Sequence, residues 1–111
     1  MPFDQYHEPP QELPEETRTF ARMCLSMIEE AEAIDWYEQR LAVEPDREAR
    51  AIMENAQQEE FKHFSMSLEW ISRHNHKFRA ALENVLFKEG DIVELGEKAE
   101  EKVDEVAEEE G

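Results

Sequence analysis

Apolar and polar residues recur along most of the chain with the spacing of amphipathic helices. Nothing breaks a helix between Pro14 and about Val43, and a second unbroken stretch runs from Asp46 to about His74-Asn75. Glu44-Pro45-Asp46 interrupts the pattern between them, because the residue before a proline avoids the helical conformation, and Asp46 can cap the second helix. The sequence therefore predicts two long helices joined by a short turn.

The two ends of the chain are expected to differ from this hairpin. Residues 1–13 hold three prolines and predict an extended N-terminal arm. The hairpin region, residues 14–90, should close with a shorter helix from Lys77 to Lys88. Asp91 could cap a last, acidic helix over residues 91–111, whose end is acidic enough to fray.

Two long helices joined by a short turn cannot cover both of their apolar faces. Each arm of about 30 residues would be ~45 Å long at ~1.5 Å per residue. Such a hairpin makes half of a four-helix bundle, and the other half must come from elsewhere. The predicted fold class is all-α, an antiparallel helical hairpin plus a C-terminal helix, completed by homodimerisation.

The charge and composition of the chain limit the classes of partner that it can bind. The net charge of −17 comes from 12 basic and 29 acidic residues. Such a field repels nucleic acid and anionic membranes and attracts cations, although a dense acidic surface also simply keeps a protein soluble. No apolar run could span a membrane, and the N-terminus lacks the form of a secretory signal. We expect a soluble, cytoplasmic protein without nucleic-acid or membrane partners, in which the single cysteine, Cys24, is a buried, inert thiol.

One line of side chains on each helix should face partner helices, and polar residues stand in the middle of both lines. Glu30 is the acid at the centre of the first line, and Glu60 and His63 lie one turn apart at the centre of the second. An unpaired carboxylate is costly to bury, so an ion pair, a protonated Glu in a hydrogen bond or a metal must compensate. Steps of four and three residues give the two lines, which are Glu16, Phe20, Met23, Met27, Glu30, Ile34, Tyr37 and Leu41, and Ala49, Met53, Ala56, Glu60, His63, Ser67, Trp70 and His74.

A metal is the explanation that these residue types favour. No Lys or Arg falls on either line near them, which weakens the ion pair, whereas a His three residues after a Glu can bind one ion from one helix face. A Glu-x-x-His by itself is common on helices. Its placement on the seam, with Glu30 at a comparable depth in the partner helix, is what makes metal binding the preferred interpretation.

The number of ligands points to an assembly. Di-iron carboxylate bundles use a Glu from each of two helices and a Glu-x-x-His from each of the other two, and this chain supplies one of each. Two chains related by a two-fold axis would supply four Glu and two His at a dimer interface. The four carboxylates would match the four positive charges of two Fe²⁺ ions.

The chain resembles the encapsulated ferritins, the short ferritin-like cargo proteins of encapsulin nanocompartments, over roughly Glu8 to Ile92. The resemblance rests on Ser26-Met-Ile-Glu-Glu-Ala-Glu-Ala-Ile-Asp-Trp-Tyr-Glu-Gln-Arg40, on Glu59-Glu-Phe-Lys-His63 and on Ser67-Leu-Glu-Trp70. It implies a ferritin-like fold, a ferroxidase centre with two irons per subunit pair at a dimer interface, and dimers arranged in a ring-shaped decamer. It also implies an encapsulin shell as partner and a place inside that compartment in the cytoplasm.

Carried across residue by residue, the resemblance implies that Glu30 bridges or caps iron, and that Glu60 and His63 are the remaining ligands. Tyr37 matches a tyrosine that lies close to the metals, and Trp36 an aromatic residue beside the path to them. Both aromatic side chains could equally fill the core or an interface.

The same resemblance gives Glu29 and Glu32 a role as a secondary site on the path to the centre, for Ca²⁺ or another divalent ion. Alternatively, Glu29 and Glu32 are ordinary solvated acids on the helix surface.

Encapsulin cargo usually ends in a short apolar targeting peptide that contains glycine, whereas this sequence ends Val106-Ala-Glu-Glu-Glu-Gly111. Either the sequence stops short of such a peptide or this protein reaches its shell differently.

The activity expected from these residues is the oxidation of Fe²⁺ by O₂ at open coordination positions. Two other functions fit the same pattern. The same ligands could sequester Zn²⁺ or Mn²⁺ without redox turnover. A purely structural helical module could instead use its mid-seam polar residues to fix the register of its helices.

Overall fold

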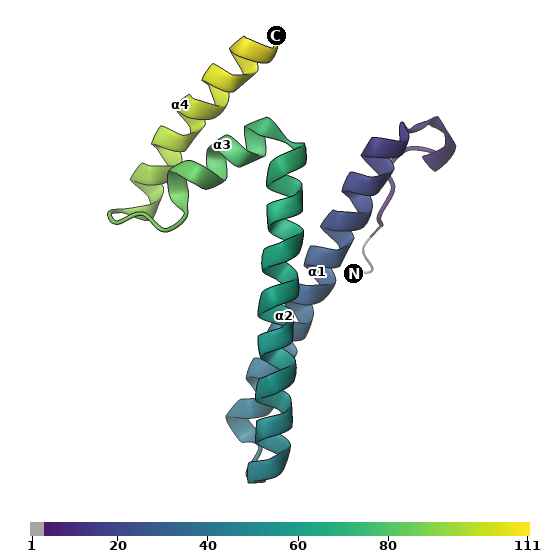
Figure 1. Ribbon diagram of the computed structural model, residues 1–111, viewed down its shortest axis with the longest axis vertical. Coiled ribbons are helices and arrows are strands. Elements are labelled where there is room, and N and C mark those ends of the chain that lie inside the picture. Colours follow the sequence, from purple (N-terminus) through teal and green to yellow (C-terminus); the bar gives the residue numbers. More distant parts are fainter. Residues whose placement is uncertain (1–3) are drawn as a thin grey trace. The chain divides into compact units, whose positions relative to one another are not determined.

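The computed structural model describes residues 4–111, and the described chain is all-α. A short 3₁₀ helix, η1, is followed by four α-helices (Figure 1). No strand occurs among residues 4–111. The helices are η1 (Pro10–Glu12), α1 (Glu15–Val43), α2 (Arg47–His74), α3 (His76–Val85) and α4 (Ile92–Glu110). The all-α class predicted from the sequence is thus confirmed.

Part of the predicted N-terminal arm can be compared with the structure. Residues 1–3, which include Pro2, lie outside the described residues. The following residues hold one turn of 3₁₀ helix, η1, in which Leu13 N–H donates to the carbonyl oxygen of Pro10 at 3.1 Å. The prolines in this part of the chain therefore give a short turn rather than a wholly extended segment.

The structure divides into two compact units, residues up to Glu69 and Trp70–Gly111, and each is described by itself. In the first unit, α1 begins directly after Pro14, and the acids Glu15 and Glu16 stand in its first turn, where the positive end of the helix dipole favours them. Asp46 then caps α2, because its Oδ2 accepts from Ala49 N–H at 2.8 Å. Both helix starts lie where the sequence predicted them.

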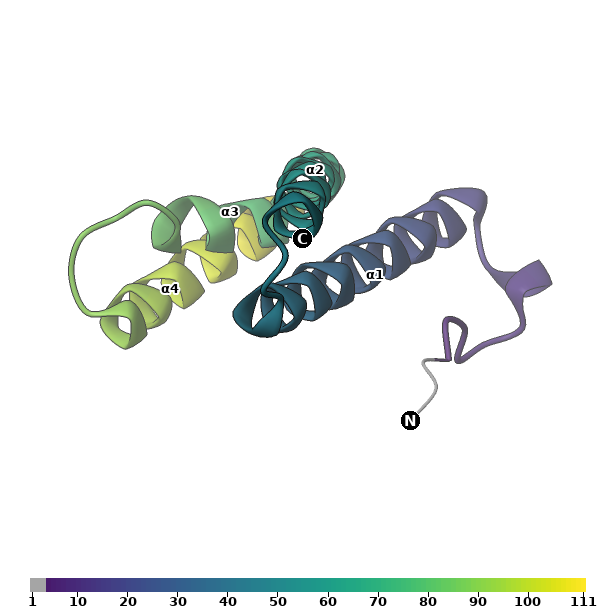
Figure 2. The same cartoon turned by 90° about the horizontal axis from the view of Figure 1, so that it is seen from below.

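Side chains of α2 bind α1 at three levels along the hairpin, the last of which is Ser67, whose Oγ donates to Glu30. The Arg50 guanidinium donates to the carbonyl oxygens of Leu41 and Glu44, which closes the end of α1. Further along, Gln57 Nε2 donates to the Ile34 carbonyl oxygen at 3.2 Å. Because successive α2 residues meet ever earlier α1 residues, the two helices run antiparallel, as Figure 1 also shows. Figure 2 views α2 nearly along its axis, from the end at which the turn joins it to α1.

The face that α2 turns toward α1 differs from the predicted seam by one position in places. Arg50 and Gln57 bind α1, whereas the predicted line passed through Ala49 and Ala56. Gln57 is buried together with Ser67, which lies on the predicted line. The predicted line is therefore rotated slightly from the face that a single hairpin buries.

In the second unit, Asn75 caps the start of α3, because its side-chain oxygen accepts from Phe78 N–H at 2.9 Å. The helix ends at Val85, earlier than the Lys88 that the sequence predicted. Leu86 is extended, and Phe87 follows with a φ of +59°, a left-handed conformation that cannot continue the helix.

The last helix, α4, packs against α3, and Ala80 of α3 and Ala99 of α4 are both buried. Asp91 caps α4 as predicted, since its Oδ1 accepts from Val93 N–H at 2.8 Å. His76 Nδ1 lies 2.8 Å from Glu110 Oε1, which joins the start of α3 to the end of α4. The helix continues to Glu110. Among residues 4–111, no helix is both long and apolar enough to cross a membrane.

Candidate metal centre

Glu60 and His63 form a pair of donors on one face of α2. His63 Nδ1 lies 3.3 Å from Glu60 Oε1, a separation that the i, i+3 spacing on a helix allows. Two donors bound to one ion at about 2.1 Å each, at a right angle or slightly wider, stand about 3.0–3.3 Å apart. The His63 side chain is 48% exposed and that of Glu60 23% exposed. The pair therefore has the spacing of two ligands of one ion and is partly exposed to solvent.

The neighbouring acid, Glu59, is engaged elsewhere. Lys62 Nζ lies 2.7 Å from Glu59 Oε2, and this hydrogen bond, with the positive charge of Lys62, lowers the pKa of the Glu59 carboxyl. Of the two consecutive acids in the Glu-Glu-x-x-His run, Glu60 is thus the one that the helix turns toward His63.

Glu30 reaches across from α1 to a different level of α2. Its Oε1 accepts a hydrogen bond from Ser67 Oγ at 2.8 Å, and its Oε2 lies 3.4 Å from the same hydroxyl. Ser67 is only 6% exposed, so this bond is made at the interface of the two helices. The Glu30 carboxylate is consequently fixed beside Ser67.

This anchoring separates Glu30 from the donor pair of its own chain. Ser67 comes seven residues after Glu60, which corresponds to about 10.5 Å along the helix axis, and four after His63, or about 6 Å. In the part of the chain that the structure describes, no three His, Cys, Asp or Glu side chains gather closely enough to hold a metal ion. A single hairpin thus presents a two-donor pair and a separate carboxylate.

The other residues to which the sequence assigned roles all lie on α1. Tyr37 is half-buried, and the Arg40 guanidinium lies 5.3 Å from the centre of its ring. Trp36 is 52% exposed and lines a shallow surface groove with Gln39 and Arg40. The structure therefore leaves Trp36 exposed on a single chain, and it does not pack Trp36 into the core.

The two acids of the expected secondary site, Glu29 and Glu32, are exposed and stand three residues apart on α1. That spacing places them on neighbouring positions of the helix surface. Neither belongs to a group of three potential metal ligands within residues 4–111.

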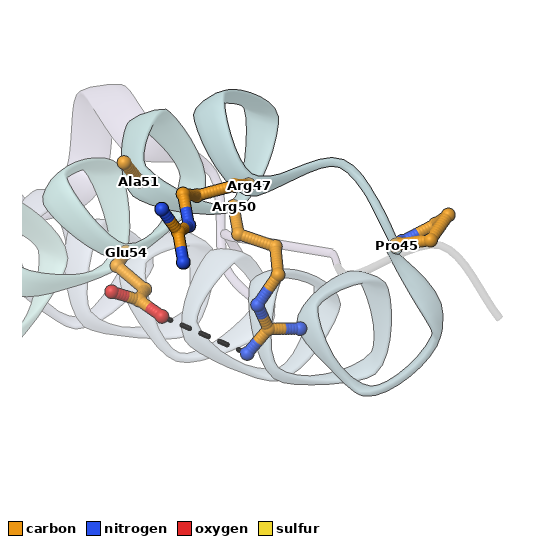
Figure 3. Close-up of a pocket in the computed structure, with 5 residues that line it drawn as sticks. All are labelled: Pro45, Arg47, Arg50, Ala51 and Glu54. Carbon is orange, nitrogen blue, oxygen red and sulfur yellow. Dashed lines mark ion pairs between the residues drawn. The ribbon is translucent and has the colours of Figure 1, made fainter.

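A separate groove of about 390 Å³ lies at the turn between α1 and α2 (Figure 3). It is lined by Pro45, Arg47, Arg50, Ala51 and Glu54, and Arg50 pairs with Glu54 at 3.7 Å. Arg50 lies ten residues, or about 15 Å, along α2 from Glu60. Its guanidinium closes the hairpin, so we regard this groove as a feature of the turn rather than of the metal centre.

Several side-chain contacts were not predicted from the sequence. Ser67 stood on the predicted line but gave no sign that its hydroxyl would bind Glu30, because the two residues are 37 positions apart. His74 stacks on Trp70, with ring centres 3.9 Å apart. His74 Nδ1 lies 2.7 Å from the Trp70 carbonyl oxygen and His76 Nδ1 lies 2.8 Å from Glu110 Oε1, and neither histidine is near the Glu60–His63 pair along the chain.

Comparison with known proteins places this arrangement in a family. The model of the EncFtn-like family matches residues 5–89. A ferritin-like protein of Thermotoga maritima is 41% identical over 95 residues, which make up 86% of this chain and 83% of that protein. An encapsulated ferritin-like protein of Rhodospirillum rubrum is 42% identical over 89 residues, 80% of this chain and 64% of that protein.

The structural comparison agrees with these matches. The crystal structure of a protein from Nitrosomonas europaea superposes with a TM-score of 0.77 at 43% identity and covers 80% of this chain and 99% of that one. The resemblance inferred from the residues around Glu30, Glu60 and His63 is therefore confirmed, and the chain belongs to the EncFtn-like family.

Proposed function

We propose that two copies of this chain build a di-iron ferroxidase centre, which oxidises Fe²⁺ to Fe³⁺ with O₂. The ligands are Glu30, Glu60 and His63 from each copy. Iron is the substrate at this site, with two Fe per subunit pair, and each Fe²⁺ gives one electron to the oxidant. The protein's part is to hold the two ions close together and to leave positions open for O₂.

The observation that carries this proposal is the 3.3 Å separation of Glu60 Oε1 and His63 Nδ1. This distance suits two ligands of one ion better than it suits a strong hydrogen bond, which would be shorter. One imidazole and one carboxylate are donors that iron accepts in either oxidation state. Because the His63 side chain is about half exposed, the pair is accessible to a second chain.

The position of Glu30 supports a centre whose ligands come from two chains. Its carboxylate is held by Ser67, one turn beyond His63, and no third ligand joins the pair within the described part of a single hairpin. A second antiparallel hairpin can bring its own Glu30 to the pair of the first. Two Glu30 and two Glu60 then give four negative charges opposite two Fe²⁺ ions, and this balance offsets the repulsion among the carboxylates.

Roles for the remaining residues follow the same proposal. Tyr37 lies near the irons, one seam step beyond Ile34. Glu29 and Glu32 form a secondary entry site for Ca²⁺ or another divalent ion, and Trp36 stands beside the path. The exposure of both acids and of Trp36 on a single chain is compatible with a path that the assembly completes.

The proposal extends to the assembly. Dimers join in a ring-shaped decamer, and an encapsulin shell encloses it in the cytoplasm and receives the ferric product. The support is family membership and the relative whose name describes it as encapsulated. The chain spans 64% of that relative's length.

The test is to add Fe²⁺ to the metal-free protein in air and to follow O₂ uptake and ferric absorbance. Glu30→Ala and Glu60→Ala should bring the rate down to that of the protein-free control. Glu38→Ala is the matched variant, because Glu38 is also an α1 acid that bonds to α2, through Gln57 Nε2 at 2.8 Å, but lies outside the proposed ligand set. It should keep most of the wild-type rate.

Each outcome has one meaning. Fast oxidation that is lost only in the two ligand variants supports the ferroxidase. Tight metal binding without oxidation would replace it with a sequestering protein for Zn²⁺ or Mn²⁺. Neither binding nor oxidation would leave a structural helical module and overturn the proposal.

A further inference from the structure

The Ser67 hydroxyl bonds to a side chain of α1, although Ser67 itself lies inside α2. A serine inside a helix can bond back to the carbonyl oxygen four residues earlier. Ser65, two positions away, does so, with its Oγ donating to the Phe61 carbonyl oxygen at 2.8 Å. Ser67 Oγ instead donates to Glu30 Oε1 at 2.8 Å on the other helix. The hydroxyl is thus committed to a carboxylate rather than to its own backbone.

From this contact we propose that Ser67 is a positioning residue, which holds the Glu30 carboxylate in the orientation that the metal centre needs. The inference rests on the proposed function, because it concerns a ligand of that centre. Ser67 does not itself bind metal in this proposal. It acts through Glu30 alone.

The hydroxyl restricts Glu30 without using up its capacity to bind metal. An ionised carboxylate offers about four lone-pair positions on its two oxygens, and one serine O–H takes one of them. Oε1 therefore keeps a free position, and Oε2, at 3.4 Å from the hydroxyl, is less engaged. A long, flexible glutamate is thereby fixed before metal arrives, so less side-chain freedom is lost when the ion binds.

The position of Ser67 also decides which donors Glu30 can join. Four residues separate Ser67 from His63, about 6 Å along the axis, and seven separate it from Glu60. Holding Glu30 at this level keeps it out of a closed three-ligand group within its own chain, in agreement with the absence of such a group among residues 4–111. The bond therefore favours ligation across the subunit interface.

Groups that orient metal ligands typically change metal affinity by 10–100-fold when they are removed. We expect Ser67→Ala to weaken binding of Co²⁺, a redox-inert probe in the absence of oxidant, by a factor in that range. The titration uses the full-length protein without O₂ and follows the visible absorption of bound Co²⁺. Ser67→Thr keeps a hydroxyl at the same place and should bind within about threefold of wild type.

Two matched variants separate positioning from mere structure. Ser65→Ala removes a neighbouring helical hydroxyl that binds only the backbone. Gln57→Ala removes the other buried side chain that joins α2 to α1, through the Ile34 carbonyl oxygen and the Glu38 carboxylate. Both should keep Co²⁺ affinity near wild type, whereas Gln57→Ala should lower the thermal stability of the metal-free protein at least as much as Ser67→Ala does.

Wild-type affinity in Ser67→Ala would overturn the inference and leave the proposed function intact. A loss that is equal in Ser67→Ala and Gln57→Ala would overturn it as well, because it would reflect hairpin stability. If Ser67→Ala does not fold, Ser67→Thr and Ser67→Val are compared instead, because a methyl group in valine replaces the hydroxyl of threonine. Equal Co²⁺ affinities of these two variants would refute the inference. If wild type and Glu30→Ala bind Co²⁺ equally, the proposed function itself fails, which is a distinct result.

Discussion

Gln57 Nε2 donates a hydrogen bond to Glu38 Oε2 at 2.8 Å and so joins α2 to α1 across the middle of the hairpin. The same amide group reaches the Ile34 carbonyl oxygen at 3.2 Å, and Gln57 is only 7% exposed. A buried amide that binds both a carboxylate and a helix carbonyl fixes the register of the two helices more specifically than an apolar contact would.

Replacement of Gln57 should therefore weaken the hairpin. Gln57→Ala removes both bonds and leaves a small void, which should lower the free energy of unfolding by about 1–2 kcal/mol. Urea denaturation of the metal-free protein, followed by circular dichroism, measures this loss. Gln58→Ala changes an exposed neighbour of the same type and should shift the free energy by less than about 0.5 kcal/mol. Equal effects of the two substitutions would contradict the role given to Gln57.

Arg50 and Arg47, the two arginines of the turn groove, should contribute unequally to the stability of the protein. The Arg50 guanidinium binds the carbonyl oxygens of Leu41 and Glu44, which the end of α1 leaves without helical partners, whereas Arg47 is exposed. Arg50→Ala should lower the free energy of unfolding by about 1–2 kcal/mol, and Arg47→Ala should change it little. Thermal unfolding of the two variants, measured side by side, gives the comparison. A larger loss for Arg47→Ala would refute this account of the turn.

Cys24 should react slowly with alkylating reagents. Cys24 is partly buried rather than fully buried as expected, and this burial raises the pKa of its thiol, whose thiolate is the reactive form. With a raised pKa, less thiolate is present at any pH below that value, so the pH midpoint of the reaction should move upward. The rate of iodoacetamide labelling of the folded protein from pH 7 to pH 10, beside free cysteine, measures the shift. A midpoint at or below that of free cysteine would show that the thiol is not shielded.

Metal should control pairing of the chains. If each ion takes ligands from two copies, metal binding and dimerisation are linked, and metal at ~100 times its dissociation constant adds about 2.7 kcal/mol to the paired form. Sedimentation velocity at low micromolar protein should show larger species after Co²⁺ is added and their loss after a chelator. Glu60→Ala should abolish the response and Glu38→Ala should not. An assembly that is indifferent to metal in the wild-type protein would count against a shared centre.

The helix boundaries were largely predictable because they depend on local chemistry. Pro14, Asp46 and Asp91 mark helix starts in the sequence, and all three stand at helix starts in the structure. The predicted end of α3 was too late in the chain because Phe87 adopts a left-handed backbone conformation. Phenylalanine has no preference for this conformation, so the sequence does not indicate it. The packing of α4 on α3 was not predicted, because helix propensity does not describe a contact between two segments of the chain.

The candidate site was predictable as a list of residues but not as a set of contacts. Glu30, Glu60 and His63 stand out because polar groups are unexpected on an apolar line. Ser67 on Glu30 and Gln57 on Ile34 are pairings between distant positions, and a pattern along one helix cannot specify them. Lines that pass through Ala56 or through Gln57 differ by one residue, and only the bonds across the hairpin decide which one faces α1.

The absence of a three-ligand group around Glu30, Glu60 and His63 among residues 4–111 has a consequence for the kinetics of iron oxidation. Under the proposed function, a lone chain carries half-sites only, so activity requires an encounter of two chains. At concentrations below the dissociation constant of the pair, the oxidation rate would rise with the square of the protein concentration, and above it in direct proportion. Newly made, unpaired chains would thus hold no working centre, and oxidation would begin only once assembly had begun.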